Sequence, residues 1–468
     1  MKRIAVVGGG ISGLAAAFAL QREQDGGAQL DYVIFESSDR FGGVIRTERV
    51  NDCLVEAGPD SFLTEKPWAA DLCRELGLGD ELISSNDAER KTYLLIKGCL
   101  VAIPDGLMFM VPTRIVPVFL SPLFSWPAKL RILREWFYRP GRNHSDVTVA
   151  DFVQRHYGRE MVERVADPLL SGVYGGSADE LSVQSVLPRF VEMEASHGSL
   201  AKAMLKARKR HQATSPVPLF TSLKMGMQQL VDAVVARIPP AARELRVAVE
   251  SVKQEYGKWL VVAEDRTQEF DAVIMATPAY SAAKLLGKAS EMAGELGAIG
   301  YSSSVTVILG YDQTVRAKLP PGFGFLVPRS EGRRILATTF VHNKFPLRAP
   351  ENVALIRCFL GGTRDAAILQ YSEDEIRSMV YRELEEVLGI RAQPLFTRVY
   401  KWPGAMAQYN VGHSARTARI RDLVGQMPGL ALAGNAYSGI GVPDCVRSGT
   451  EAAGKILGDL AIAKGAPG

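Results

Sequence analysis

The feature that most constrains this chain is a glycine pattern close to its N-terminus. A β-branched run at residues 4–7 leads into Gly8-x-Gly10-x-x-Gly13, and an alanine-rich, strongly helical stretch follows. In a dinucleotide-binding unit the first glycine allows a tight turn, the second lets the backbone approach a pyrophosphate, and the third lets the helix pack against the strand. The N-terminus of that helix faces the phosphates. The pattern therefore predicts a βαβ unit that binds a dinucleotide.

The residues after the helix favour FAD over NAD. A second strand at residues 32–35 ends at Glu36, where a carboxylate can accept hydrogen bonds from both ribose hydroxyls. Units of this kind bind either cofactor, so the next stretch decides. Gly42-Gly43 lets the backbone pass close to a second phosphate, and Arg40 and Arg46 on either side supply positive charge. We therefore predict FAD as the cofactor.

Two further turns are candidates for flavin contacts. Residues 56–61 form a turn that could approach the flavin, and residues 433–435 close a strand near the other end of the chain. Residues 439–445 then open a helix, and the partial positive charge of its N-terminus would stabilise a reduced, anionic flavin. The alternative is an ordinary glycine-capped turn followed by an ordinary helix.

Composition narrows the class of protein. A chain of 468 residues exceeds what one hydrophobic core supports, so two or three domains are expected. A net charge of +4 is too small to indicate a nucleic-acid partner. The five cysteines are widely spaced, which argues against a disulfide framework and against a zinc site, and no metal is expected. With no signal peptide or apolar run long enough to span a membrane, we expect a cytoplasmic protein.

Two stretches carry unusual surface chemistry. Residues 104–140 are apolar, broken by prolines and mixed with basic residues, which fits a cap over a core, a surface that dips into one membrane leaflet, or a gate to an apolar channel. Residues 196–214 are basic, which fits a solvated helix face or contact with a membrane surface. At most a peripheral attachment to the inner face of the membrane is expected.

The order of the expected elements predicts a mixed α/β fold with inserted domains. Dinucleotide signals lie at both ends of the chain, and unrelated helices and strands lie between them. We expect a discontinuous Rossmann-like FAD-binding domain at residues 1–90, 220–280 and 415–468. A helical, membrane-associating domain is expected at residues 91–219, and a substrate-binding sheet domain at residues 281–414.

Three stretches carry a resemblance to a known family. Residues 168–182, residues 405–413 (with Ala407 where the family has proline) and residues 434–445 are each similar to signatures of the protoporphyrinogen/coproporphyrinogen oxidases of heme biosynthesis, within the flavin amine oxidase superfamily. The resemblance spans nearly the whole chain. It implies oxidation of a porphyrinogen to a porphyrin with the loss of six electrons in three FAD-dependent rounds, with O₂ as the final oxidant.

The resemblance and the motifs together give the expected site. The expected FAD contacts are Gly8, Gly9, Gly10, Ile11, Ser12, Gly13, Glu36, Ser37, Arg40, Gly43, Val44, Gly58, Pro59, Asp60, Ser61, Val249, Trp402, Gly434, Ile440, Gly441 and Val442. The resemblance implies an apolar wall for a flat tetrapyrrole made by Leu169, Gly172, Phe323, Leu326 and Phe359, although apolar strand residues are more often plain core. No catalytic acid or base is assigned, and His413 is interpreted as structural.

Two departures from the family pattern bear on the substrate. Many members that take protoporphyrinogen carry arginine where this chain has Thr92, so coproporphyrinogen III is the favoured substrate and protoporphyrinogen IX the alternative. A second departure, Met225 in the family's Gly-Gly-Met turn, weakens any argument from that loop. A flavin amine oxidase is a rival on the same fold, but the lysine such enzymes place near the flavin is missing from residues 305–307. A carotenoid desaturase and a flavoprotein that binds heme intermediates without turnover are further rivals.

Overall fold

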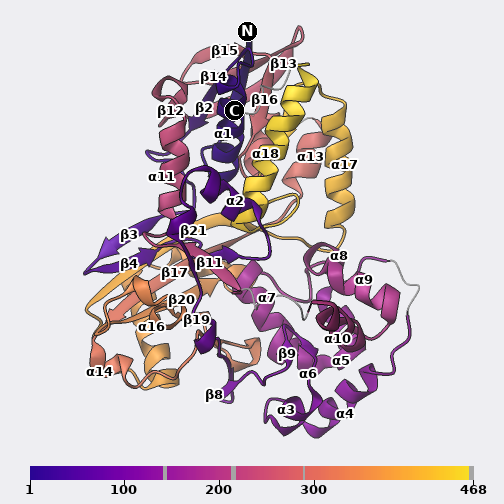
Figure 1. Cartoon of the computed structure of the whole chain (residues 1–468), viewed down its shortest axis with the longest axis vertical. Coiled ribbons are helices and arrows are strands. Elements are labelled where there is room, and N and C mark those ends of the chain that lie inside the picture. The colour runs from indigo at the N-terminus through magenta and orange to yellow at the C-terminus, as the bar shows by residue number, and fades with distance from the viewer. Residues whose placement is uncertain (141–144, 212–217, 288–289, 463–468) are drawn as a thin grey trace.

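The computed structural model describes residues 1–140, 145–211, 218–287 and 290–462. Figure 1 shows three regions: a layered α/β region that contains the N-terminus, a sheet region below it, and a group of helices beside that sheet. The mixed α/β fold predicted from the sequence is confirmed.

A parallel sheet forms the centre of the first region. Within the described residues it has five strands in the order β12-β2-β1-β16-β22, and each pair is parallel. The strands are β1 (Lys2–Val7), β2 (Leu30–Glu36), β12 (Arg243–Leu245), β16 (Ala272–Met275) and β22 (Leu430–Leu432). They come from the beginning, the middle and the end of the chain, so the sheet is discontinuous in sequence. In an open parallel sheet, ligands bind beyond the carboxyl ends of the strands.

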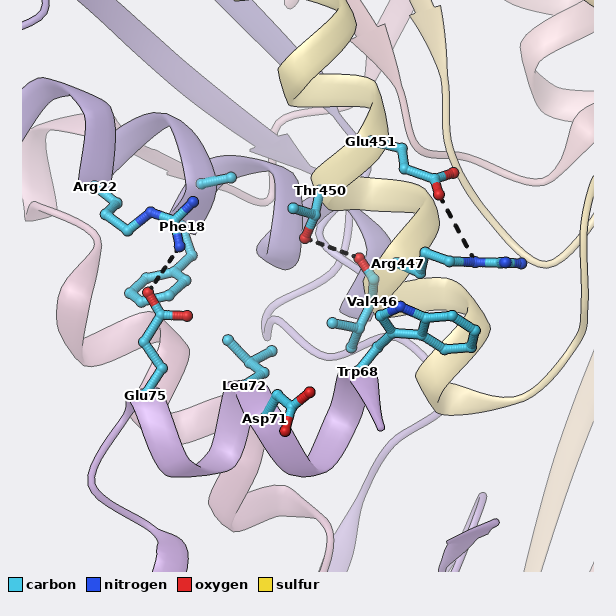
Figure 2. A pocket seen from close by; sticks show the side chains of 11 residues that line it. Phe18, Arg22, Trp68, Asp71, Leu72, Glu75, Val446, Arg447, Thr450 and Glu451 are labelled. Atoms are coloured by element: carbon cyan, nitrogen blue, oxygen red, sulfur yellow. Dashed lines mark hydrogen bonds and ion pairs between the residues drawn. The ribbon is translucent and has the colours of Figure 1, made fainter. Parts of the chain in front are cut away.

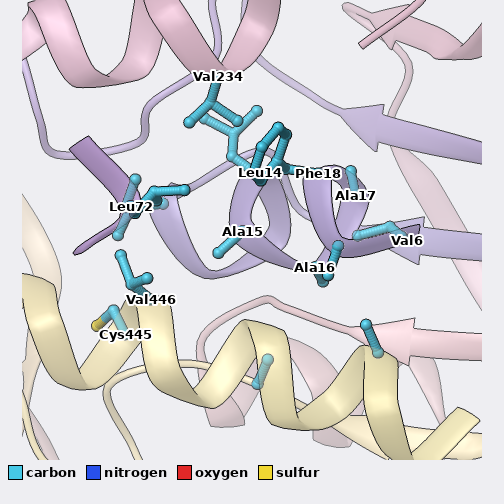
Figure 3. Close-up of a cluster of buried hydrophobic side chains, with 14 of the residues drawn as sticks. Val6, Leu14, Ala15, Ala16, Ala17, Phe18, Leu72, Val234, Cys445 and Val446 are labelled. Atoms are coloured by element: carbon cyan, nitrogen blue, oxygen red, sulfur yellow. The ribbon is translucent and has the colours of Figure 1, made fainter. Parts of the chain in front are cut away.

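Helix α1 (Ile11–Asp25) is buried from Ile11 to Gln21 and forms the core on one face of this sheet. Figure 3 shows side chains from three other helices gathered around it, with Leu72, Val234 and Val446 among them. The helices are α2 (Trp68–Glu75), α11 (Gln228–Arg237) and α18 (Val442–Asp459). A Cβ at Gly449 of α18 would lie 2.0 Å from the carbonyl oxygen of Ser12, so α1 and α18 approach more closely than side chains would allow.

The other face of the parallel sheet is covered by a small antiparallel sheet and three helices. Alternate residues of β1 divide between the two cores, since Ile4 and Val6 face α1 while Ala5 and Val7 face the second cluster. The covering elements are β13 (Val249–Glu255), β14 (Lys258–Ala263), β15 (Arg266–Phe270), α12 (Ala279–Leu285), α13 (Glu291–Gly297) and α17 (His413–Gly425).

The second region is a mixed sheet, which in the described residues has seven strands ordered β21-β17-β20-β19-β18-β7-β8. Only the β18–β7 pair among these is parallel. The strands are β7 (Thr92–Ile96), β8 (Cys99–Ala102), β17 (Tyr301–Tyr311), β18 (Gly324–Leu326), β19 (Ile335–Phe340), β20 (Ala354–Gly361) and β21 (Phe396–Ala407). Helix α16 (Glu373–Leu388) packs with one face of this sheet through a core that includes Val307, Cys358 and Val380.

Short strands join the first two regions. β3 (Thr47–Val50) pairs with β4 (Cys53–Glu56), and β11 (Phe220–Leu223) lies between β5 (Phe62–Leu63) and β6 (Leu82–Ser84). The pairings of β11 bring residues 62–63 and 82–84 next to residues 220–223, which precede α11.

The third region is helical and has its own core. Its helices are α3 (Ile115–Leu120), α4 (Trp126–Glu135), α5 (Val149–Tyr157), α6 (Arg159–Met161), α7 (Asp167–Tyr174), α8 (Val183–Val186), α9 (Pro188–His197) and α10 (Leu200–His211). A π-helical turn over Val162–Ala166 leads into α7. Residues 92–102, which the sequence assigned to this region, instead form β7 and β8 of the mixed sheet, because β7 pairs with a strand more than 200 residues away.

A buried histidine holds four of these helices together. The Nδ1 of His156 on α5 lies 3.4 Å from Oε1 of Glu135 on α4, and its Nε2 lies 3.2 Å from Oε1 of Glu194 on α9. Glu135 also accepts hydrogen bonds from the Ser199 hydroxyl and from the backbone N–H of Leu200 at the start of α10. Burial alone would lower the pKa of His156, but the hydrogen bonds to the two carboxylates outweigh it and raise that pKa.

Among the helices of the described residues, none is both long enough and apolar enough to cross a membrane.

Candidate cofactor and substrate site

The glycine pattern forms a tight turn at the carboxyl end of β1. Gly8 has φ +109°, and a Cβ there would lie 2.6 Å from the carbonyl oxygen of Ala276, which follows β16. A Cβ at Gly13 would lie 1.9 Å from the carbonyl oxygen of Gly8, so the first turn of α1 sits directly on the loop. Both positions therefore require glycine for the strand, the turn and the helix to come together.

Gly10 differs from its two neighbours in the motif because open space lies beside it. A Cβ at Gly10 would meet no atom within 4 Å, although the residue has an ordinary φ of −68°. Gly42 donates its backbone N–H to the carbonyl oxygen of Gly9 (2.8 Å), and a Cβ at Gly43 would lie 3.3 Å from Cα of Gly10. The two glycine-rich loops are thus in direct contact, and the open space beside Gly10 at the helix N-terminus fits the pyrophosphate of a dinucleotide. Ile11 and Ser12 are buried in the first turn of α1 behind it.

Glu36 and Arg40 are engaged with nearby backbone rather than free. The Glu36 carboxylate accepts hydrogen bonds from the N–H groups of Gly9 and Ser38, each 2.8 Å long. The Arg40 guanidinium donates to the carbonyl oxygens of Phe41, Gly43 and Ile45, which pins the second glycine loop. The sequence predicted that Glu36 contacts the ribose and that Arg40 contacts a phosphate; in this structure both side chains stabilise the glycine loops. The neighbouring residues Ser37 and Val44 are exposed.

The C-terminal glycine turn lies near the first glycine loop, because Thr277 approaches both Gly8 and Gly434. Gly434 has φ +137° and follows β22, and Gly441 is the N-cap of α18, with Ile440 half-buried before it and Val442 buried after it. The helix therefore begins at Val442, within residues 439–445. Thr277 approaches Gly8 with its methyl group and Gly434 with its carbonyl oxygen, and its buried hydroxyl finds no hydrogen-bond partner among the described residues. An unsatisfied buried hydroxyl beside open backbone fits a site for a polar cofactor.

Asp444 fixes the turn at the start of α18. Its carboxylate accepts a hydrogen bond from the N–H of Gly441 (3.3 Å) and an ion pair from Nζ of Lys66 (2.6 Å). A Cβ at Gly439, whose φ is +123°, would lie 2.3 Å from Cγ of Asp444. A carboxylate at this position also suits the positive end of the helix dipole.

The three stretches that carried the family resemblance meet around Tyr409. Its hydroxyl donates to the carbonyl oxygen of Asn435 (2.7 Å) and accepts from the N–H of Gly439 (2.8 Å), which joins residues 405–413 to the C-terminal turn. The neighbouring Gln408 donates to the carbonyl oxygen of Tyr174 at the end of α7 (2.8 Å). Stretches far apart in sequence thus form one hydrogen-bonded junction between the three regions.

His413 stacks on this junction. Its ring lies parallel to that of Tyr409 with centroids 4.0 Å apart, and burial followed by the charge of Arg416 lowers the pKa of His413 to about 4. With this pKa the imidazole is neutral at physiological pH, and its structural role stays a prediction.

The turn at residues 58–61 packs against the second glycine loop. A Cβ at Gly58 would lie 1.8 Å from the carbonyl oxygen of Val44, and Trp402 of β21 donates its Nε1–H to the carbonyl oxygen of Ala57 (3.0 Å). The Asp60 carboxylate points into the protein, where it accepts from Nζ of Lys344 (3.0 and 3.1 Å) and from the Ser61 hydroxyl (2.7 Å). Of the expected contacts in this turn, Asp60 can therefore offer a cofactor only its backbone.

Burial alone would raise the pKa of Asp60, but the Lys344 ammonium and the Arg357 guanidinium outweigh it and hold that pKa well below its usual range. The remaining expected cofactor contact, Val249, is half-buried at the first position of β13.

The predicted substrate wall is partly assembled on one face of the mixed sheet. Leu326 of β18, Ala337 of β19 and Phe359 of β20 lie opposite one another in register, so their side chains share a face. A Cβ at Gly172 of α7 would lie 3.4 Å from Cδ2 of Leu326 and 3.8 Å from Cβ of Ala337, so α7 covers this row. Leu169, also on α7, packs on the same helical core as Leu326. Phe323 is buried one residue before β18, outside the row.

Thr92 lies on the same face of the sheet. It pairs in register with Gly324, Gly324 with Thr339, and Thr339 with Arg357. Because these positions are two residues away from the row of Leu326 and Phe359 along each strand, they point to the same side. The sequence position used to predict substrate choice is therefore next to the wall that it was expected to influence.

Sequence reasoning missed three buried cations near this face: Lys344, Arg348 and Arg357. Each is at most 8% exposed. The available signal was a charged residue inside an apolar segment, as with Arg357 in the middle of the apolar strand β20. Local patterns identify such residues as unusual but do not show their partners.

A surface depression of about 290 Å³ lies away from the glycine loops, between α1, α2 and α18 (Figure 2). Its apolar lining includes Phe18, Trp68 and Leu72. Two ion pairs, Arg22 with Glu75 and Arg447 with Glu451, lie within its lining. It contains none of the predicted site residues. In the described part of the chain, no group of histidine, cysteine or carboxylate side chains is arranged to hold a metal ion.

Comparison with known proteins gives consistent matches over the whole chain. The family model described as flavin containing amine oxidoreductase matches residues 11–457. A coproporphyrinogen III oxidase of Bacillus subtilis (strain 168) is 32% identical over 463 residues, covering 97% of this chain and 98% of that protein. A protoporphyrinogen oxidase of Homo sapiens is 32% identical over 485 residues, covering 98% of each.

Solved structures show the same fold. A crystal structure from Exiguobacterium sp. 255-15, whose name assigns it provisionally to the protoporphyrinogen oxidases, has a TM-score of 0.88 and 28% identity over 98% of this chain and 99% of that one. A cyclohexylamine oxidase from Brevibacterium oxydans IH-35A has a TM-score of 0.68 at 18% identity, over 98% of this chain and 99% of that one, which indicates a shared fold alone.

Proposed function

The chain belongs to the family of flavin containing amine oxidoreductases, and from that premise we propose that it is an FAD-dependent oxidase that converts a porphyrinogen to a porphyrin, with coproporphyrinogen III as the favoured substrate. Several relatives over nearly the full length are named coproporphyrinogen III oxidases, in Bacillus subtilis, Staphylococcus aureus and Propionibacterium freudenreichii. Protoporphyrinogen IX is the alternative, because relatives with that name match over the same length.

One observation carries this proposal: the apolar row of Leu326, Ala337 and Phe359 faces α7. A flat, largely apolar tetrapyrrole needs a wall of this kind, with few directional bonds. Arg357 links this face to the turn at residues 58–61 by donating to the carbonyl oxygen of Gly58, and Gln408 links the end of α7 to the Tyr409 junction. Substrate and cofactor would therefore meet between the first and second regions.

The chain's own groups would bind the cofactor, orient the substrate and exclude water. The open space beside Gly10 and the first turn of α1 would hold the pyrophosphate, and the positive end of the α18 dipole would favour negative charge on a reduced flavin. Bound FAD would accept two electrons from the porphyrinogen in each of three rounds, with O₂ as the final oxidant. The apolar wall keeps the reacting carbon away from water, and positioning accounts for much of the rate in such a reaction. We assign no catalytic acid or base.

The test is direct oxidation of both porphyrinogens by the purified, yellow protein in air, followed by porphyrin fluorescence. We expect catalytic formation of porphyrin well above the rate of spontaneous oxidation, with a larger kcat/KM for coproporphyrinogen III, since that ratio reports differential binding of the transition state. Benzylamine and a carotenoid precursor serve as substrates for the two rival activities on this fold. Oxidation of either one without porphyrin formation would contradict the proposal, as would a colourless protein that binds NADH.

We further propose that the helical region makes peripheral contact with an anionic membrane surface. Eight large apolar side chains within residues 108–137 are exposed: Met108, Phe109, Ile115, Val116, Leu120, Trp126, Leu130 and Phe137. We call them the apolar tip. Leu120 is 81% exposed and Phe137 78% exposed, and the basic residues Arg114, Arg131 and Arg134 are exposed among them. Apolar groups ringed by cations favour the surface of an anionic bilayer.

Flotation with anionic liposomes tests this contact. Leu120→Asp together with Trp126→Asp should reduce the bound fraction about tenfold. Each change removes apolar surface that the membrane would bury and adds a negative charge that the anionic lipids repel. Tyr256→Asp is the matched control, since Tyr256 is fully exposed in the turn between β13 and β14. Equal binding of all three proteins would reject the apolar tip as the contact. A need for detergent even at high salt would show insertion instead.

The cytoplasm is the compartment that we infer. All five cysteines are free thiols in the structure, and four of them are buried. Free thiols persist in a reducing compartment.

A further inference from the structure

Five charged side chains, four of them buried and Asp60 half-buried, lie together between the turn at residues 58–61 and the mixed sheet. We call Glu56, Asp60, Lys344, Arg348 and Arg357 the charge cluster. Nζ of Lys344 lies 3.0 Å from the Asp60 carboxylate, Arg357 lies 3.7 Å from it, and Arg348 lies 3.5 Å from Glu56. Three cations face two carboxylates, so the cluster carries a formal charge of +1.

The excess charge is not neutralised by the surrounding hydrogen bonds. Arg348 is 0% exposed and Arg357 is 4% exposed. The Nε atom of each arginine is buried without a hydrogen-bond partner in the described residues. An unbalanced buried charge is strongly unfavourable unless something compensates it. A cluster of this kind is therefore a candidate for a functional role rather than a contribution to stability alone.

The cluster lies directly behind the expected cofactor site. Gly43 approaches Gly10 across the first glycine loop, and the next residue, Val44, contacts Gly58. Asp60 belongs to the same turn as Gly58, and Arg357 donates to the carbonyl oxygen of Gly58. On its other side the Arg357 guanidinium lies 4.6 Å from the ring centroid of Phe359, which is in the apolar row. The excess positive charge thus sits between the glycine loops and the substrate wall.

We propose that Lys344 and Arg357 are positioning residues whose excess positive charge, held against the turn by Asp60, stabilises the negative charge that FAD acquires when two electrons and one proton reduce it. This inference rests on the proposed function only in that the cofactor is FAD. Charges fixed in a water-poor interior act strongly on a neighbouring group because little solvent screens them.

Two substitutions of opposite charge separate this role from a structural one. Lys344→Met removes a positive charge and should make the reduction potential of bound FAD more negative. Asp60→Asn removes a negative charge from the same ion pair and should make the potential more positive. We expect each to change the reduction equilibrium constant about tenfold, which is about 30 mV for a two-electron couple. The double variant should return close to the original potential.

The measurement is equilibration of the bound FAD with reference dyes at pH 8, without any porphyrinogen. Burial raises the pKa of Glu56 to about 7, so this carboxylate is ionised at pH 8. Lys344→Arg keeps the charge and should keep the potential. The ion pair of Lys258 with Asp271 (2.8 Å) lies at the amino end of β16, away from the glycine loops, so Lys258→Met and Asp271→Asn are matched controls that should leave the potential unchanged.

Shifts of Lys344→Met and Asp60→Asn in the same direction, or no shift in either, would overturn the inference. If Asp60→Asn does not fold, Glu56→Gln removes a negative charge from the same cluster and should also raise the potential. A wild-type protein that binds no FAD would refute the proposed function instead, and the two failures are therefore distinguishable.

Discussion

The glycine loops and the helical region of this protein are built in opposite ways. In the glycine loops the backbone makes the surface, and at positions such as Gly13 and Gly58 the neighbouring backbone leaves no room for a side chain. In the helical region the side chains make the structure: His156 and two glutamates join four helices, and exposed apolar residues form the apolar tip. Adding a side chain should therefore disrupt the glycine loops, whereas removing a buried charge should lower the stability of the helical region.

The largest effect should come from filling the open space beside Gly10. Gly10→Val places a side chain where no protein atom lies within 4 Å, and the φ of −68° is compatible with valine. The apoprotein should fold with an unchanged Tm, but affinity for FAD should fall at least ~100-fold because the pyrophosphate loses its space. Titration of apoprotein with FAD, followed by flavin fluorescence, measures the Kd.

Gly13→Ala is the contrasting variant for that experiment. Its Cβ would lie 1.9 Å from the carbonyl oxygen of Gly8, so this change should lower the stability of the whole first region. If Gly10→Val unfolds the protein, or if it still binds FAD tightly, the space beside Gly10 does not have the role assigned to it.

The second prediction concerns His156 and pH. Its pKa is raised in the folded state, so its contribution to stability is complete below the unfolded pKa of about 6.5 and is lost as pH rises through the folded pKa. The hydrogen bond from His156 lowers the pKa of Glu194, whose contribution is present above about pH 4.5 and is lost as pH falls. The helical region should be most stable between about pH 4.5 and 6.5.

His156→Gln should destabilise the helical region by about 3 kcal/mol at pH 6, because two buried carboxylates lose their cation, and by less at pH 9. Urea unfolding followed by the fluorescence of Trp126 and Trp136 measures this, and FAD affinity should stay unchanged. His197→Gln, on the same helix as Glu194 and half-buried, is the control. An equal loss at both pH values would show that the imidazole contributes through packing and not through its charge.

The smallest expected effect is on substrate choice at Thr92, where the mixed sheet meets the helical region. Thr92→Arg should shift the ratio of kcat/KM for the two porphyrinogens about tenfold toward protoporphyrinogen IX, since a fixed guanidinium suits a substrate with fewer carboxylates to place. Thr267→Arg, on the exposed strand β15, makes the same change far from the wall. A wild-type preference for protoporphyrinogen IX, or an unchanged ratio, would reject the argument from this position.

The same contrast explains what could be predicted from the sequence. The strand, turn and helix around Gly8 and Gly13 are set by neighbours in sequence, so their types and order could be predicted. β17 and β20 of the mixed sheet lie within residues 281–414, where a sheet domain could be predicted because the apolar residues of its strands are contiguous. Pairing of Thr92 with Gly324, and of Lys344 with Asp60, joins residues more than 200 positions apart, and no local pattern specifies such contacts.

Glu36 shows a different limit. Its position at the end of β2 was predicted, but the direction of its carboxylate depends on which N–H groups the adjacent glycine loop presents. The residue type and spacing identify a carboxylate near the loop, whereas the partner it takes is decided by three-dimensional packing.

The close contact of α1 with α18 has a consequence for how the protein is made. Helix α1 is buried from Ile11 to Gln21, yet α18, which covers it, begins more than 400 residues later. At the usual rate of synthesis α1 leaves the ribosome roughly 20 to 80 s before its partner exists. During that time its apolar surface must be held by other segments or by a chaperone. The site that β22 and the turn before α18 complete can then capture FAD only as a late step of folding.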